Sequence, residues 1–70
     1  MDILDLRNIV VEVMRLNRVK QGKTLRGVIP AIDKWADELI REFVKDGRLD
    51  DFLQLDYNDA KSKIVELLNE

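Results

Sequence analysis

The sequence predicts a small all-α protein, a bundle of three main helices with one short helical turn. Within each long segment, apolar residues recur at steps of three and four, which is the spacing of one helical face. Leu, Ile, Val, Lys, Asp and Glu dominate the composition, and this usage suits helices. Glycine and proline stand only at or between the ends of these segments, at positions 22, 27, 30 and 47.

A first helix is expected over residues 2–21, with Asp2 placed to cap its start and Gly22 to follow its end. The alternative for this segment is a strand through residues 9–13, where four β-branched residues lie close together. No Gly or Pro bounds that run, which favours the helix. Five apolar residues share the expected core face: Leu6, Ile9, Val10, Val13 and Leu16.

A second helix is expected over residues 30–46, because Pro30 fits a first helical turn and Gly47 suits the position after the last one. Residues 49–55 are apolar enough to close one end of a core but too few to form an independent helix. We therefore expect a short helical turn there.

A last helix is expected over residues 57–69, with Asp56 as its cap. We expect one domain, residues 1–70, with the three main helices around a shared core. Trp35 has two interpretations, since Trp is enriched at interfaces, but its place on an apolar stripe favours core packing. The expected core residues are Leu6, Val10, Val13, Trp35, Leu39, Phe43, Ile64 and Leu67.

The small size of the chain argues for self-association. A domain of 70 residues removes only about 60% of its unfolded surface from water. Because the chain has no Cys and no His, neither disulfides nor a conventional zinc site can add stability. Regular helix packing and self-association remain, and we expect a two-fold homodimer as the simplest form.

Most enzyme templates are excluded for lack of residues. Without His or Cys there is no His-based general base and no Cys nucleophile, and Ser62 lacks a supporting constellation. The letters GKT at residues 22–24 match the end of a phosphate-binding P-loop, but Asn17 stands where that motif requires a glycine. We therefore expect a non-enzymatic protein with no catalytic residue, no cofactor and no small-molecule substrate.

The aspartates of the second half do not predict a metal site. An EF-hand loop that used Gly47 as its glycine would place Leu53 where a bidentate Glu is required. We expect these aspartates to cap helices and fill turns. They are Asp46, Asp50, Asp51, Asp56 and Asp59.

No segment predicts contact with a membrane. The longest apolar run has three residues, which is too short for a spanning helix or for the apolar part of a signal peptide. A chain without Cys also fits a reducing compartment. We therefore expect a soluble, cytoplasmic protein.

One candidate surface is a flank of the first helix, outside its core face. Leu4 and Val11 fall outside that face and line up at seven-residue steps with Arg18, beside Arg7 and Arg15. Arginine among exposed aliphatic groups is a composition that protein interfaces favour, so we expect these five residues to bind protein. Three occupants remain open: a neighbouring helix of the same chain, a second copy, or a foreign protein.

A second candidate surface is the basic segment of residues 15–26. It holds five bases and no acid, whereas residues 35–70 carry ten acids against five bases. A basic patch can bind phosphates, but this one has no aromatic residue to stack on a base, and the net charge of the chain is −2. Cations near the negative end of a helix, or contact with an acidic surface of the same fold or of a second subunit, also explain it. The possible phosphate-binding residues are Arg15, Arg18, Lys20, Lys23 and Arg26.

Taken together, these features predict a non-enzymatic accessory or regulatory protein that acts by occupying the surface of a protein partner. The alternative is a nucleic-acid-associated protein that binds phosphates without sequence specificity.

Overall fold

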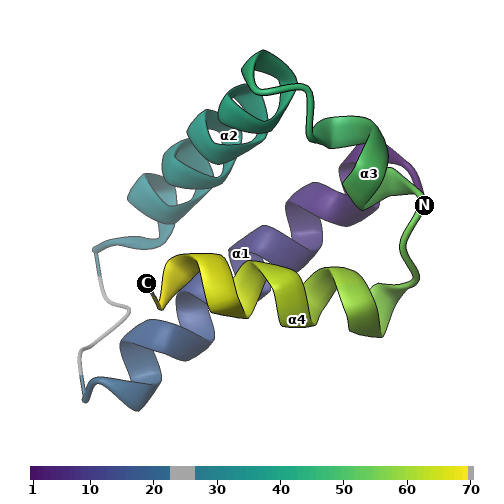
Figure 1. Cartoon of the computed structure of the whole chain (residues 1–70). Coiled ribbons are helices and arrows are strands. Elements are labelled where there is room, and N and C mark those ends of the chain that lie inside the picture. The colour runs from purple at the N-terminus through teal and green to yellow at the C-terminus, as the bar shows by residue number, and fades with distance from the viewer. Residues whose placement is uncertain (23–26, 70) are drawn as a thin grey trace.

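The computed structural model describes residues 1–22 and 27–69 and confirms the all-α fold class (Figure 1). Residues 9–13 are helical, so the strand alternative is wrong, and the described part of the chain contains no strand. The helices follow the predicted segments to within two residues at each end. They are α1 (Ile3–Lys20), α2 (Ile29–Lys45), α3 (Leu49–Leu53) and α4 (Tyr57–Leu68).

The predicted caps fix the helix ends. Oδ1 of Asp2 accepts a hydrogen bond from the backbone N–H of Asp5, and Oδ1 of Asp56 accepts one from that of Asp59, both at 2.8 Å. Each contact satisfies a donor that a helix start leaves without a partner in the helix. Beyond α2, Gly47 has a φ of +72°, in the left-handed region that glycine enters without strain.

The central element is α1, which packs against α2, α3 and α4. Figure 1 shows α4 crossing α1 on one side, while α3 connects the end of α2 to the start of α4. The ring of Phe52 on α3 stacks on Phe43 of α2 with centroids 4.4 Å apart. The short helix therefore closes one end of the core, as the sequence predicts.

The core contains five of the eight residues predicted for it: Leu6, Val10, Val13, Phe43 and Ile64. Leu39 and Leu67 are half-buried at its edge. Ala36 and Ala60 are fully buried, and these small side chains let α2 and α4 come close to their neighbours.

Three apolar residues, Trp35, Leu16 and Val11, differ from the prediction in their exposure. Trp35 is 42% exposed, because the buried positions of α2 centre on Ile32, Ala36 and Phe43 and leave Trp35 at the border of the stripe. Its prediction as a core residue is wrong.

Leu16, predicted on the core face of α1, is 51% exposed. The buried residues of α1 end at Val13, and Figure 1 shows the C-terminal end of α1 extending past α4. Val11, predicted outside the core face, is only 9% exposed and belongs to the core cluster. The spacing of residues along the helix predicts the direction of each side chain. The length and position of the neighbouring helices decide which side chains are buried.

None of the helices in the described part of the chain combines the length and the apolar character that crossing a membrane requires.

Candidate protein-binding surface

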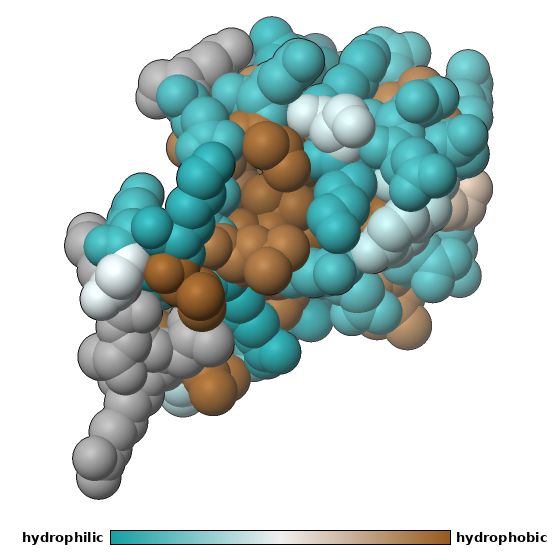
Figure 2. All heavy atoms as spheres, turned by 90° about the horizontal axis from the view of Figure 1, so that it is seen from below, coloured by the Kyte–Doolittle hydropathy of each residue, from teal (hydrophilic) through white to brown (hydrophobic). Residues whose placement is uncertain are grey.

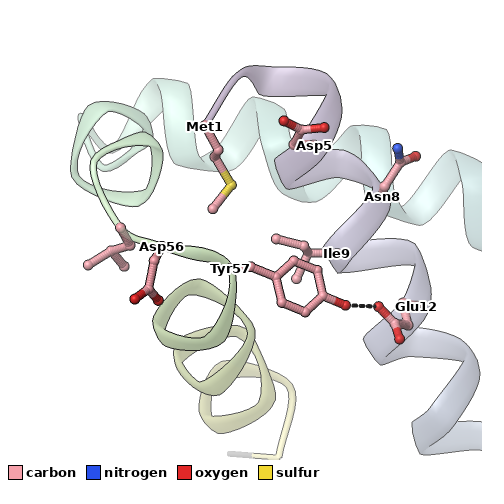
Figure 3. A pocket seen from close by; sticks show the side chains of 8 residues that line it. Met1, Asp5, Asn8, Ile9, Glu12, Asp56 and Tyr57 are labelled. Carbon is pink, nitrogen blue, oxygen red and sulfur yellow. Dashed lines mark hydrogen bonds between the residues drawn. The ribbon is translucent and has the colours of Figure 1, made fainter.

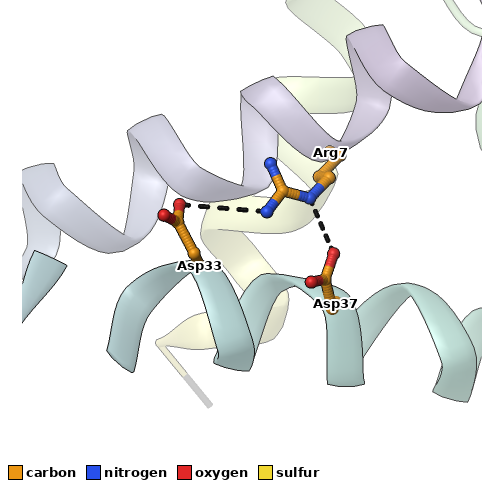
Figure 4. Close-up of polar contacts among 3 residues, drawn as sticks. All are labelled: Arg7, Asp33 and Asp37. Atoms are coloured by element: carbon orange, nitrogen blue, oxygen red, sulfur yellow. Dashed lines mark hydrogen bonds and ion pairs between the residues drawn. The ribbon is translucent and has the colours of Figure 1, made fainter. Parts of the chain in front are cut away.

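Arg7 connects α1 to α2 in the middle of the predicted flank. Its Nε donates a 2.6 Å hydrogen bond to Oδ1 of Asp37, and its Nη2 lies 3.9 Å from Oδ1 of Asp33 (Figure 4). Asp33 and Asp37 are one helical turn apart, so both carboxylates face the same guanidinium. At this point the flank of α1 is an interface within the chain.

This contact shifts the pKa of both partners and favours the charged form of each. The hydrogen bond from Arg7 is the main cause that lowers the pKa of Asp37, and the positive charges of Arg7 and Arg41 lower it further. The same hydrogen bond is the main cause that raises the pKa of Arg7. Arg7 and Asp37 therefore stay charged through the whole neutral range of pH.

Two hollows lie along the seam between α1 and α2, and Arg7 lines both. The first, which we call the Leu4 hollow, is lined by Ile3, Leu4, Arg7, Asp37, Ile40 and Arg41. The second, the Val11 hollow, is lined by Arg7, Asn8, Val11, Glu12, Arg15, Leu16 and Asp33. We call the residues of the two hollows together the α1–α2 flank. It combines apolar and charged side chains on two packed helices, and Arg7 joins its two hollows.

The structure brings four of the five predicted protein-binding residues to this flank. Leu4 is 61% exposed, whereas Val11 is buried in the wall of its hollow. Arg7 is half-buried, and Arg15 is exposed at the rim of the Val11 hollow. Arg18 is half-buried one turn beyond these residues and lines neither hollow. A neighbouring helix of the same chain thus covers Val11 and leaves Leu4 open.

The basic segment is described only in part, because Lys23 and Arg26 lie outside the described residues. Arg18 and Lys20 occupy the last turn of α1, where cations are favoured by the negative end of the helix. Leu16 and Val19 are exposed on the same end of the helix, at 51% and 58%. This end of α1 therefore presents apolar as well as basic groups.

A contact between Tyr57 and Glu12 was not predicted. The Tyr57 hydroxyl donates a 2.5 Å hydrogen bond to Oε2 of Glu12, and Nζ of Lys61 lies 3.5 Å from Oε1 of the same carboxylate. Figure 3 shows this contact beside a hollow that Met1, Ile9 and neighbouring residues line. The sequence feature that could have predicted this contact is the position of Tyr57 at the edge of an apolar stripe, because its hydroxyl group requires a hydrogen-bond partner.

The pKa shifts of Glu12 and Tyr57 suit a contact that holds two helices together rather than one that transfers protons. The hydrogen bond from Tyr57 is the main cause that lowers the pKa of Glu12, and the same bond is the main cause that raises the pKa of Tyr57. A general acid or base works best when its pKa lies near the working pH. Both shifts move these two groups away from neutrality.

The described acids do not assemble a metal site. Within residues 1–22 and 27–69, no three carboxylates come together in a way that could hold an ion. Asp56 caps α4, as the sequence predicts. Asp50 lies in the first turn of α3, where the positive end of the helix favours an acid.

Several large apolar side chains remain exposed on the described surface. Figure 2 shows one face on which hydrophobic side chains gather in the middle with hydrophilic ones around them. Exposed apolar patches with polar rims mark interaction sites on soluble proteins. Over all faces of the described surface, the exposed large apolar residues are Ile3, Leu4, Leu16, Val19, Ile29, Trp35, Val44 and Tyr57.

In comparisons with protein-family models, with curated proteins and with solved structures, nothing matches this chain.

Proposed function

We propose that the chain is a non-enzymatic accessory or regulatory protein that acts by occupying the surface of a protein partner with its α1–α2 flank. One observation carries the proposal: Leu4 is 61% exposed beside Arg7 and Arg41, on a seam between two packed helices. Arginine is enriched in protein interfaces, and an exposed aliphatic side chain beside it supplies apolar area that a partner can bury.

The fixed geometry of the flank supports this proposal. Two carboxylates of α2 hold the guanidinium of Arg7, and α1 itself packs against three other helices. A surface that is ordered before binding loses less conformational entropy when the partner arrives. The flank therefore presents a preorganised surface to a partner.

The non-enzymatic part of the proposal rests on the residues present. The chain has neither His nor Cys, so the commonest general base and the most reactive nucleophile are missing. The hydrogen-bonded pair of Tyr57 and Glu12 has pKa values displaced away from neutrality. The residues of the α1–α2 flank therefore suit binding better than catalysis.

Cross-linking in the source cells tests the proposed function. A photoreactive phenylalanine analogue at position 4 should yield an adduct with a protein on irradiation, because the partner covers this side chain. The same analogue in place of Val19, which lies on the same helix and is exposed to a similar degree (58%), is the matched control. No adduct at position 4, or equal adducts at both positions, would contradict the proposal.

A second proposal is nucleic-acid binding through Arg15, Arg18, Lys20, Lys23 and Arg26. Its specific support is the C-terminal end of α1, where three of these cations stand and residues 13–22 contain no acid. Binding of labelled nucleic acid should then weaken steeply as salt rises, and the double change Arg15→Gln and Lys20→Gln should flatten that dependence. Failure to bind at about 50 mM salt would remove this second proposal.

A further inference from the structure

We infer that the occupant of the α1–α2 flank is a second copy of this chain, related by a two-fold axis, with Leu4 of each copy in the Val11 hollow of the other. The inference rests on the proposed function, since it requires that the flank be a protein-contact surface. It adds the identity of the partner and the way in which the two surfaces meet.

The balance of charges on the flank is the first argument. The two hollows are lined by three bases, Arg7, Arg15 and Arg41, and by three acids, Glu12, Asp33 and Asp37. In a two-fold interface the same patch faces itself, so a patch of one sign would repel its own copy. A patch with equal numbers of both signs, whose acids are paired within each chain, carries no such net repulsion.

The same argument disfavours the end of α1 beyond the flank as the seam. Residues 17–22 carry two bases and no acid, so two copies joined there would bring like charges together. A strongly acidic or basic partner would likewise find little net attraction on the balanced flank. Charge therefore permits a second copy on the flank and disfavours a strongly charged partner.

The shape of the flank is the second argument. Leu4 is an exposed apolar side chain, and the neighbouring Val11 hollow offers the apolar side chains of Val11 and Leu16. Leu4 and Val11 are seven residues apart, about 10 Å along a helix. If two α1 helices lie antiparallel about an axis near Arg7 and Asn8, both Leu4 side chains reach a hollow at the same time.

Arg7 lies close to this axis, where two copies of one cation would otherwise repel each other. In each copy Asp37 and Asp33 hold its guanidinium at 2.6 and 3.9 Å and compensate its charge. The contact within the chain thus removes the main electrostatic obstacle to pairing. Pairing also buries exposed Leu4 and Leu16, which adds apolar burial that a domain of this size otherwise lacks.

The test is the solution mass of the intact chain over a wide range of concentrations, by sedimentation equilibrium. We expect a species of twice 8.2 kDa that dissociates on dilution. Leu4→Glu should raise the dissociation constant about tenfold or more, because it places a charge in an apolar contact. Val19→Glu is the matched control and should dimerise as the wild type does. Glutamate in the first turn of a helix is favourable, so Leu4→Glu should fold, and circular dichroism verifies this.

Each contrary outcome has a distinct meaning. A wild-type chain that stays monomeric at every concentration overturns the second copy as occupant. If position 4 still cross-links to another protein in cells, the proposed function survives that result. A Leu4→Glu variant that dimerises as tightly as the wild type overturns the flank as the seam. A monomer with no cross-link at position 4 overturns both the inference and the proposed function.

Discussion

The hydroxyl group of Tyr57 donates a hydrogen bond to Glu12 across 45 residues of sequence, and this contact links the first turn of α4 to the middle of α1. On the same helix, Arg7 makes the corresponding contact to α2. The central helix therefore makes polar contacts to both long neighbours, through Glu12 toward α4 and through Arg7 toward α2.

Removal of the Tyr57 hydroxyl should lower the stability of the fold and change its dependence on pH. The folded state lowers the pKa of Glu12, so the stability from this group is present above its ordinary pKa of about 4.3 and is lost as the pH falls through the lowered value. The raised pKa of Tyr57 keeps the donor protonated through the neutral range.

Urea unfolding of the wild type and of Tyr57→Phe between neutral pH and pH 3 measures this effect. The wild type should lose stability below about pH 4, and the variant should lose less over the same interval. Part of the loss should remain in the variant, because the pKa of Asp37 is also lowered. An identical loss in both proteins would contradict the role of the Tyr57 contact.

The contact between Arg7 and Asp37 should appear as a coupling free energy in a double-mutant cycle. Arg7→Met and Asp37→Asn should each lower the midpoint of thermal unfolding, and the double variant should lose less than the sum of the two. A second cycle that pairs Arg7→Met with Glu38→Gln, at an exposed residue next to Asp37, is the control. Equal coupling in both cycles would show that the Asp37 contact does not hold α2 to α1.

Two valines on the same helix give a matched test of the core. Val13 is 1% exposed and Val19 is 58% exposed, so the same change removes buried methyl groups at one position only. Val13→Ala should cost about 1.5–3 kcal/mol of unfolding free energy, whereas Val19→Ala should stay within about 0.5 kcal/mol of the wild type. Comparable losses at both positions would contradict the position of α1 in the fold.

The fluorescence of the single tryptophan reports whether Trp35 is accessible in the free chain. Because Trp35 is 42% exposed, its emission should be red-shifted and quenched by iodide to a substantial fraction of the quenching of a free tryptophan derivative. Emission that is blue-shifted and protected from iodide in the monomer would favour the core position that the sequence predicts.

The helices were predictable because their signals are local. The spacing of apolar residues, the caps at Asp2 and Asp56 and the glycine at position 47 all act within a few residues of chain. The interior of the core was predictable for the same reason. Phe43 and Ile64 lie at the centre of their apolar stripes, where any packing of amphipathic helices would bury them.

The edges of the core and the polar contacts were harder to predict, because they depend on where helices cross. Trp35 and Leu16 lie on apolar stripes, yet they stay 42% and 51% exposed, while Val11 is buried in the core cluster. The flank was identified from Leu4 and the arginines of α1, but two of its three acids, Asp33 and Asp37, come from a helix distant in sequence. Periodicity indicates the face of a helix, and only the tertiary structure supplies its partner.

Disulfide trapping tests the geometry of the flank as a two-fold seam most directly, because the chain contains no Cys of its own. Asn8→Cys places one thiol near the inferred axis, where the two copies come within disulfide distance, whereas Ser62→Cys places it on the exposed surface of α4. Under mild oxidation, Asn8→Cys should become a covalent dimer rapidly and Ser62→Cys should not. A dimer that forms through Cys at position 62 as fast as at position 8, or no dimer at position 8, would contradict the flank as the seam.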